Sequence, residues 1–398
     1  MTPKGFRLHL GIFGRRNVGK SSLLNALTRQ QTSIVSELAG TTTDPVEKPM
    51  ELSPIGPVQF IDTAGIDDGG AIGERRIQKT REVFDRTDIG IVVSDGAFSV
   101  FERQIVDELQ QRDIPIIFAF NKSDLTEPTT AAVVELEERG IPFVRIAAIH
   151  GTGLVALREL LVRTVPDDFL SPPPIVSDLV PPGELIVLVV PIDKEAPKGR
   201  LILPQVQTIR DILDGDRCCV IVKDVQLKFV LDRLKTPPAL VVTDSQAFAK
   251  VSAITPEDVP LTSFSILFAR QKGDFASMVE GAKAIGSLHS GSRVLVAESC
   301  THHPIDEDIG TVLIPNMLRK FVGGNLEIAH IRGHDFPKAD LADWNLVIHC
   351  GACMVNRREI LSRVLHCGEA GVPITNYGLA IAFMLGIFER AIRGVVLK

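Results

Sequence analysis

The sequence is poor in the residues that nucleic-acid-binding proteins use in quantity. Its 398 residues include one Trp and one Tyr beside 19 Phe, and acidic residues outnumber basic ones, for a formal net charge of −6. A broad basic surface and a set of exposed stacking rings are therefore not expected. These shortages argue against a nucleic-acid partner such as tRNA or the ribosome.

Long apolar runs and a secretory signal are also missing. No apolar run reaches the ~18 residues that a membrane-spanning helix needs, and the start "MTPKGFRLHLGIFG" has no apolar signal core. We therefore expect a cytoplasmic protein without a membrane partner.

Cysteine is scarce as well. In a reducing compartment the six cysteines are poor candidates for disulfides, so clustered ones are considered first as metal ligands.

What is present is a pattern typical of α/β domains. Between residues 6 and 165, short apolar runs alternate with amphipathic helical segments, which predicts a mostly parallel sheet covered by helices. The proline-rich "VPDDFLSPPPIVSDLVPPG", residues 165–183, favours an extended connector and a domain boundary. Because single domains typically have ~100 to 200 residues, we predict a Ras-like P-loop domain followed by two smaller α/β domains, the last with a parallel sheet. Their expected ranges are residues 1–168, 169–263 and 264–398.

The stretch "GRRNVGKS", Gly14–Ser21, fits the phosphate-binding loop that follows a strand and opens a helix. Its glycines let backbone N–H groups close around phosphates at a helix N-terminus. Lys20 is expected to neutralise the β- and γ-phosphates, and the Ser21 hydroxyl to ligate Mg²⁺. The expected nucleotide-binding residues of this loop are Gly14, Asn17, Val18, Gly19, Lys20, Ser21 and Ser22.

The stretch "DTAG" supplies the second part of the phosphate site. Asp62 is expected to hold Mg²⁺ through water, and Gly65 to offer its N–H to the γ-phosphate. Switch I is expected in "AGTTTD", residues 39–44, with Thr42 as a Mg²⁺ ligand and Thr41 as its competitor. We assign no general base. The expected catalytic residues are Lys20, Thr42, Asp62 and Gly65.

The stretch "NKSD", which ends at Asp124, is expected to select the base. Asp124 can accept hydrogen bonds from the N1–H and the exocyclic amine of guanine, a donor pair that adenine lacks. ATP would leave this carboxylate unpaired, so GTP is the expected nucleotide. Asn121 and Lys122 complete the motif, and in "AAIHGTGL" the backbone of Ala148 can donate to the base. Together these motifs predict a GTPase.

After "DTAG" comes Ile66, where Ras-like enzymes place a water-orienting Gln. The chain must therefore orient water or neutralise charge in another way. In "GRRNVGKS", "AGTTTD" and "DTAGI" it resembles the translation-factor-related GTPases of tRNA modification and ribosome assembly. Many of these use K⁺ in place of an arginine finger. The resemblance implies Asn17 as the K⁺ ligand and hydrolysis that K⁺ stimulates.

Thiols gather near the end of the chain in "CTH", Cys300–His302, and "HCGAC", His349–Cys353, each just after a predicted strand. In an open parallel sheet the loops at the carboxyl ends of the strands meet in one crevice. Cys300, Cys350 and Cys353 could thus serve one metal ion or cluster. Three Cys and one His form an ordinary zinc site, whereas three thiolates with an exchangeable fourth ligand hold a [4Fe-4S] cluster. Residue types alone leave both open.

A GTPase domain followed by two units, "CTH" and "HCGAC" closely resembles the [FeFe]-hydrogenase maturation GTPases over the whole chain. The resemblance implies a scaffold that binds a [4Fe-4S] cluster through Cys300, Cys350 and Cys353, with His302 or His349 as a candidate fourth ligand. It also implies that this iron–sulfur domain, residues 264–398, accepts a diiron precursor. A homodimer formed by the middle domain is implied as well, as is delivery to apo-[FeFe]-hydrogenase with the radical-SAM maturases HydE and HydG.

The rival interpretation is an RNA- or ribosome-assembly GTPase whose Cys/His motif holds structural zinc. Metal content distinguishes the two, since an iron–sulfur protein is brown and a zinc protein is colourless. Outside the motif, "RCCVIVK" is expected to place Cys218 and Cys219 in a buried strand, and Cys367 is expected to serve packing. His9 and the other histidines outside the motif are expected on the surface or in loops.

Overall fold

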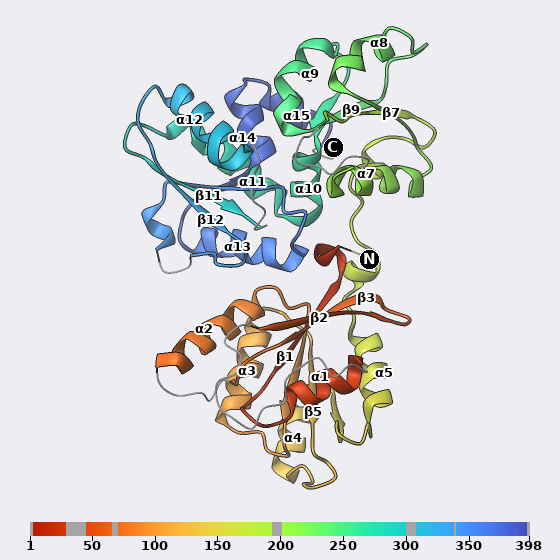
Figure 1. The fold of residues 1–398 in the computed structure, drawn as a ribbon, viewed down its shortest axis with the longest axis vertical. Coiled ribbons are helices and arrows are strands. Elements are labelled where there is room, and N and C mark those ends of the chain that lie inside the picture. The colour runs from red at the N-terminus through yellow and green to blue at the C-terminus, as the bar shows by residue number, and fades with distance from the viewer. Residues whose placement is uncertain are drawn as a thin grey trace. The chain divides into compact units, whose positions relative to one another are not determined.

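The structure is a computed structural model of the chain, and it describes residues 3–28, 45–65, 71–192, 201–299, 308–337 and 340–395. Thr42, Ile66, Cys300 and His302 lie outside these ranges. The chain splits into two compact units, Met1–Pro172 and Pro173–Lys398 (Figure 1). In the described residues no helix is long and apolar enough to cross a membrane.

The first unit is built on a six-stranded sheet in the order β2-β3-β1-β4-β5-β6, in which β2 is antiparallel to β3 and the other pairs are parallel. One hydrophobic layer lies under α1 and α5, and another under α2, α3 and α4. This arrangement confirms the expected Ras-like α/β class. The elements are η1 (Lys4–Phe6), β1 (Leu8–Phe13), α1 (Lys20–Thr28), β2 (Val46–Leu52), β3 (Gly56–Asp62), α2 (Ala71–Phe84), β4 (Ile89–Ser94), α3 (Val100–Gln111), β5 (Ile116–Phe120), α4 (Thr130–Glu138), β6 (Phe143–Arg145), α5 (Leu154–Thr164) and α6 (Asp167–Leu170).

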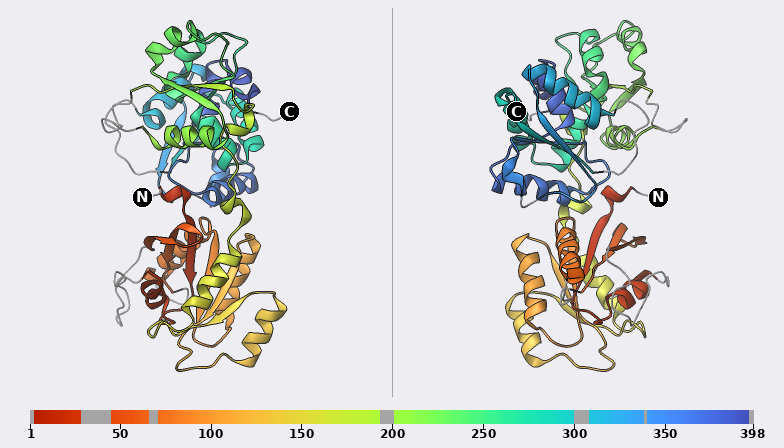
Figure 2. Two further views of the ribbon diagram at one scale, coloured as in Figure 1. Left: turned by 90° about the vertical axis from the view of Figure 1, so that its right-hand side faces the viewer. Right: turned by 60° about the vertical axis from the view of Figure 1, so that its left-hand side comes forward.

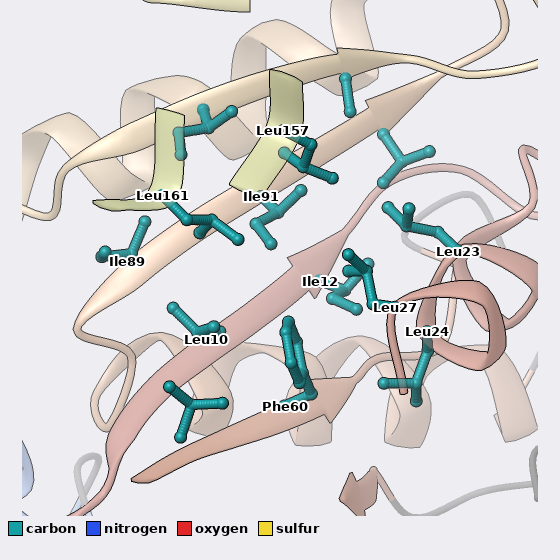
Figure 3. Close-up of a cluster of buried hydrophobic side chains, with 14 of the residues drawn as sticks. Leu10, Ile12, Leu23, Leu24, Leu27, Phe60, Ile89, Ile91, Leu157 and Leu161 are labelled. Carbon is teal, nitrogen blue, oxygen red and sulfur yellow. The ribbon is translucent and has the colours of Figure 1, made fainter. Parts of the chain in front are cut away.

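Strand β1 lies at the centre of this core, and all six of its residues are buried. In the layer that Figure 3 shows, Leu10 and Ile12 of β1 share a core with Leu24 of α1 and Leu157 of α5. Burying each of these side chains contributes about 1.5–3 kcal/mol. Because β1 ends at Phe13, this packing also fixes where the following phosphate loop begins.

The second unit contains two four-stranded parallel sheets, in the orders β10-β9-β7-β8 and β12-β11-β13-β14. In the latter sheet, α13 lies on one side of the strands and α12 and α14 on the other (Figures 1 and 2). The strands are β7 (Leu185–Val189), β8 (Cys218–Val222), β9 (Leu240–Thr243), β10 (Leu261–Ser263), β11 (Arg293–Glu298), β12 (Glu327–Arg332), β13 (Leu346–His349) and β14 (Ile374–Asn376).

Helices connect the strands of the second unit, as parallel pairing requires. The α-helices are α7 (Leu203–Asp214), α8 (Leu227–Leu231), α9 (Phe248–Ile254), α10 (Phe264–Lys272), α11 (Phe275–Lys283), α12 (Ile314–Val322), α13 (Arg357–Glu369), α14 (Tyr377–Met384) and α15 (Phe388–Arg393). The short helical turns are η2 (Ser177–Leu179), η3 (Asp224–Gln226), η4 (Ser245–Ala247), η5 (Ala284–Ser287), η6 (Ile309–Leu313) and η7 (Leu341–Asp343).

The proline-rich segment is anchored in its second half. Val176 is fully buried, and the backbone N–H groups of Val176 and Ser177 donate to Asp211 Oδ2 of α7 at 2.8 and 2.7 Å. These bonds lie just after the division between the units at Pro172 and Pro173. The second half of the expected extended connector is therefore bonded to α7.

Two expectations about burial are wrong. Strand β8 lies at the edge of its sheet, paired with β7 among the described strands, so Cys218 is exposed and Cys219 is only half-buried. His9 is fully buried in β1, where its Nδ1 lies 3.0 Å from Arg86 O. Cys367 is fully buried, as expected of a packing residue. An apolar pattern predicts a strand but does not tell an edge strand from a central one.

An ion cluster fastens the edge strand β2 to the rest of the first unit. Glu47 of β2 accepts a hydrogen bond from Lys4 Nζ at 2.9 Å and forms an ion pair with the buried Arg86. Burial raises the pKa of Glu47, but the charges and hydrogen bonds of Arg86 and Lys4 lower it more, to about 2. This carboxyl group therefore stabilises the fold only while it is ionised.

We expect Glu47→Gln to lower the free energy of unfolding of the first unit by on the order of 2 kcal/mol at pH 7. A carboxyl group with a lowered pKa contributes fully above its ordinary pKa of 4.5, and the contribution disappears as the pH falls toward 2. The difference between parent and variant should therefore shrink at pH 3. Urea unfolding followed by circular dichroism at both pH values measures it.

Glu51→Gln is the matched control, because Glu51 is an exposed carboxylate of the same strand. The single Trp of the chain, Trp344, lies in the second unit, so its fluorescence reports whether that unit unfolds separately. A difference that stays constant between the two pH values would contradict the role given to Glu47.

Candidate functional site

The phosphate loop joins β1 to α1 and requires glycine at both ends. Gly14 has a φ of +149°, and a Cβ there would lie 2.3 Å from Val93 O. Gly19 has a φ of +93°, and a Cβ there would lie 2.3 Å from Asn121 Nδ2. A side chain at either position would collide with β4 or with the base-binding loop. The two glycines therefore let the loop lie against both neighbours.

Lys20 lies over this loop and is nearly buried. Its Nζ donates to the carbonyl groups of Gly14 at 2.9 Å and of Arg15 at 2.7 Å. Arg15 in turn donates from Nε to Glu102 Oε1 at 2.7 Å and from Nη2 to Asp95 Oδ1 at 2.9 Å. The sequence analysis missed this brace, which holds the loop against α3. The Lys20 ammonium is thus placed where phosphate oxygens can replace the carbonyl groups.

Ser21 and Asp62, two of the expected Mg²⁺ residues, lie together. Ser21 Oγ donates to Asp62 Oδ2 at 2.6 Å, while Asp62 Oδ1 is buried with no hydrogen-bond partner among the described residues. Burial raises the pKa of Asp62, against the Ser21 hydrogen bond and the charges of Lys20 and Lys48. A buried oxygen without a partner is costly. The pair therefore fits Mg²⁺, which prefers oxygen ligands.

On the base side, Asn121 ties two loops together. Its Nδ2 donates to Val18 O at 2.8 Å, and its Oδ1 accepts from the Ala148 N–H at 3.0 Å. This N–H already donates to Asn121, so its donation to guanine stays a prediction. Asp124 is exposed, with its Oδ2 3.4 Å from His150 Nε2. Its carboxylate is accessible to a base.

The sequence analysis also missed Lys48, which lies near the Mg²⁺ residues. It is 6% exposed, and its Nζ donates to Asn25 Oδ1 of α1 at 2.8 Å. Burial lowers the pKa of Lys48, while the charge of Asp62 raises it. In the strand "VEKPMEL", alternation puts Lys48 on the same face as the apolar Val46 and Met50. A lysine on an apolar face was the signal in the sequence. Such a lysine places a positive charge near the carboxylate of Asp62, which is expected to hold Mg²⁺.

The second candidate site lies at the carboxyl ends of the strands in the last sheet. β11 and β13 pair in parallel with Ala297 opposite His349. The residues that follow the two strands, Ser299 and Cys350, are therefore neighbours. The Ser299 N–H donates to Cys350 Sγ at 3.3 Å. Cys353 follows in the same loop and is half-buried.

The loop after β13 directs backbone N–H groups at its first thiol. Ala352 has a φ of +55°, an uncommon conformation for a residue with a Cβ. Burial raises the pKa of Cys350, but its pKa is lowered overall, and hydrogen bonds from the Ser299 and Ala352 N–H groups contribute to this lowering. Burial and the neighbouring Cys350 raise the pKa of Cys353 to about 11. Thiols with N–H donors directed at sulfur suit a bound metal ion or an iron–sulfur cluster.

His349 has partners at both ring nitrogens. Arg363 Nη1 donates to Nε2 at 2.8 Å, so the ring is neutral and its Nδ1–H donates to Cys350 O at 2.8 Å. A neutral ring adds no charge beside Cys350. The geometry therefore supports the backbone N–H groups as the cause of the lowered pKa of Cys350. In this structure His349 orients the loop. Its role as fourth ligand stays a prediction, as does that of His302.

Arg363 is a further residue that the sequence analysis missed. It is 3% exposed and also forms an ion pair with the buried Glu359 of the same helix. Cys300 and His302 lie outside the described residues. Within the described ranges, no group of three or more His, Cys, Asp or Glu side chains could hold a metal ion. The structure thus describes two of the three thiols predicted for the metal site and leaves Cys300 outside its described ranges.

Three family models match successive parts of the chain. Residues 9–122 match the model described as a 50S ribosome-binding GTPase. Residues 175–273 match the hydrogen maturase F dimerization domain, and residues 276–394 match the hydrogen maturase F tetramerization domain. The chain has the domain architecture of a hydrogen maturase F GTPase. Helix α10 falls within the dimerization match, and the expected domain ranges stay predictions.

Curated relatives match the GTPase part of this hydrogen maturase F architecture. The tRNA modification GTPase MnmE of Heliobacterium modesticaldum is 39% identical over 165 residues, which is 39% of this chain and 34% of that protein. The GTPase Der of Mycoplasmopsis pulmonis is 32% identical over 169 residues, 39% of each chain. The chain thus spans little more than a third of the length of these relatives. A solved structure of Era with MgGDPNP and nucleotides 1506–1542 of 16S ribosomal RNA covers 54% of this chain and 92% of that chain, with 20% identity and a TM-score of 0.37.

Proposed function

We propose that this chain is a GTP-hydrolysing scaffold and carrier in the maturation of [FeFe]-hydrogenase. It binds a [4Fe-4S] cluster through Cys300, Cys350 and Cys353, accepts a diiron precursor and delivers it to apo-[FeFe]-hydrogenase. The radical-SAM maturases HydE and HydG are its partners in building that precursor. The observation that carries the proposal is the Ser299 N–H directed at Cys350 Sγ, in a chain with hydrogen maturase F domains.

The contact between Ser299 and Cys350 supports one site for the three cysteines. Cys300 is the residue after Ser299, and consecutive Cα atoms lie about 3.8 Å apart. Because Ser299, the residue before Cys300, contacts Cys350, we infer that Cys300 and Cys350 serve one site. Three thiolates hold a [4Fe-4S] cluster and leave one iron without a protein thiolate. We infer that the diiron precursor is accepted at this open position.

The geometry of the first unit supports GTP with Mg²⁺ as its nucleotide. In the proposed roles Lys20 neutralises phosphate charge, Ser21 and Thr42 ligate Mg²⁺, and Asp62 holds the ion through water. Asp124 selects guanine, because it can accept both of the donors that guanine presents. Hydrolysis then serves as a switch that times the exchange of partners, separate from the chemistry of the cluster.

We expect GTP hydrolysis to be about tenfold faster in K⁺ than in Na⁺, because Ile66 offers no polar group and Asn17 can hold a cation against the phosphates. Asn17 is exposed and has a φ of +61°. Asn17→Gly removes the amide and suits this backbone, so it should abolish the stimulation without straining the loop. Phosphate release in matched KCl and NaCl buffers measures the effect. Equal rates of the parent in both salts would remove K⁺ from the proposal.

We also propose that two copies of the chain pair through β8. This edge strand presents the exposed Cys218 and Ile221 in a largely apolar sequence. Edge strands of this kind recruit a further strand. A second copy is the occupant that we infer, because residues 175–273 match a dimerization domain.

Ile221→Lys should weaken self-association by about tenfold or more, because it places a charge within the strand that pairs. Val134→Lys is the control, since Val134 is 45% exposed against 44% for Ile221 but lies on α4 of the other unit. Sedimentation velocity over a series of concentrations measures the fraction of dimer. An unchanged fraction in Ile221→Lys would show that another surface makes the contact.

The test of the carrier proposal separates the two sites. Cys300→Ala, Cys350→Ala and Cys353→Ala should each lower bound iron severalfold and abolish hydrogenase activation, because a cluster on three thiolates cannot spare one. GTP hydrolysis should persist in these variants, since the phosphate loop uses none of the sulfurs. Lys20→Ala should have the opposite effect, with hydrolysis lost and iron retained. Cys218→Ala is the control for a thiol outside the motif.

Each variant is co-expressed with its maturation partners, purified anaerobically and mixed with apo-hydrogenase. Iron, zinc, phosphate release and hydrogen evolution are then measured. His349→Ala should retain more iron than the cysteine variants, because a loop-orienting residue is easier to replace than a thiolate. Full activation by the three cysteine variants would end the carrier proposal. One zinc per chain without iron would favour an RNA- or ribosome-assembly GTPase with structural zinc.

A further inference from the structure

The last turn of α10 contacts the loop that carries Cys350 and Cys353. Lys272, which is 4% exposed, donates from Nζ to Val355 O at 2.9 Å and to Ala352 O at 3.1 Å. Burial lowers the pKa of Lys272 to about 8, while the nearby thiols act in the opposite direction. A buried ammonium is costly unless it has partners. The positions of Lys272 and of this loop therefore depend on each other.

The two residues before Lys272 contact the chain where it enters the second unit. We call residues 173–178 the entry segment, since Pro173 is the first residue of that unit. Arg270 forms an ion pair with Asp178, and Gln271 Nε2 donates to Pro173 O at 3.1 Å. Three consecutive residues of α10 thus reach both the entry segment and the cysteine loop, residues 350–356.

A further bond joins the same turn to the helix that follows the cysteine loop. Arg357, the first residue of α13, donates from Nη1 to Gln271 O at 3.3 Å. Asn356 caps α13 by accepting from the Glu359 N–H at 3.2 Å. The cysteine loop is therefore bounded by β13 within the sheet and by a helix start that is bonded to α10.

We propose that the turn Arg270–Lys272 couples the entry segment to the cysteine loop, with Lys272 as the residue that positions the loop. A helix moves as a rigid element, and a displacement of about 1 Å breaks ordinary hydrogen bonds unless both partners move together. The entry segment continues the chain from the nucleotide-binding unit, so this turn gives the nucleotide state a route to the cysteines. That route rests on the proposed function, whereas the coupling concerns contacts within the second unit.

Hydrogen exchange of the metal-free protein tests the coupling without a cluster. Arg270→Ala alters the entry side alone, yet it should speed amide exchange in the cysteine loop by about tenfold. Lys272→Met keeps the length of the side chain and removes its charge. This variant alters the loop side and should speed amide exchange in the cysteine loop and in the entry segment. Arg210→Ala and Lys283→Met are the matched controls, because both residues are exposed members of ion pairs in the same unit.

A charge swap separates coupling from a general loss of stability. Arg270→Asp should loosen the entry segment and the cysteine loop, and the addition of Asp178→Arg should restore slow exchange in both. Exchange in β11 should stay unchanged in every variant that folds. The Arg270 variants test the coupling between the entry segment and the cysteine loop even if Lys272→Met does not fold. Faster exchange confined to the entry segment in these variants would overturn the proposal.

The route from the nucleotide is tested on the whole protein, loaded with GDP or with a non-hydrolysable GTP analogue. Exchange in the cysteine loop should differ at least about threefold between the two states in the parent and be equal in Arg270→Ala. Equal exchange in the parent would overturn the route. A parent that binds no iron would instead overturn the proposed function, while the exchange results would still decide the coupling.

Discussion

The parallel pairing of β11 with β13 is the constraint on which the cysteine site depends. It sets Ala297 opposite His349, and Ser299 and Cys350 meet although 51 positions separate them in the sequence. A slip of one residue would turn the side chains of β13 to the opposite face. All four residues of β13 are buried, so such a slip would also cost most of its packing. Hydrophobic packing of the strand thus holds the thiol loop in place.

The nucleotide site follows from the same geometry but solves a different electrostatic problem. β1 and β3 pair in parallel with Ile12 opposite Asp62, so the phosphate loop leaves the sheet beside that carboxylate. Here Asp62 Oδ1 is buried without a hydrogen-bond partner in the part of the chain that the structure describes, and Lys20 and Lys48 lie close by. In the cysteine site, the Ser299 N–H donates to Cys350 Sγ, and the positive charge of the buried Lys272 lowers the pKa of Cys353. The first site thus suits Mg²⁺, and the second would suit the thiolate-bound cluster of the proposed function.

The phosphate loop could be predicted from the sequence because a backbone cradle demands glycine at fixed positions. The glycines of "GRRNVGKS" lie where a Cβ would collide, and alternating apolar segments predicted the α/β class. The edge position of β8 could not be predicted, since a strand pattern does not state how many neighbours the strand has. The contacts of buried polar residues could not be predicted either. Lys272 lies 80 positions from Ala352, its partner, and a single lysine in a helix gives no sign of where it points.

Helix α10 explains how the two sheets of the second unit can act together. It starts directly after β10 of the sheet formed by β7–β10, which we call the middle sheet. Near that start Asn376, the last residue of β14, donates to Ser265 O at 2.7 Å. At its end Lys272 holds the cysteine loop. One helix therefore joins the middle sheet, the sheet of β11–β14 and the entry segment, and its two bonds to the cysteine loop are buried. A dimer formed through the middle sheet could influence the cysteines through this helix, without any contact between the partner and the cysteine loop.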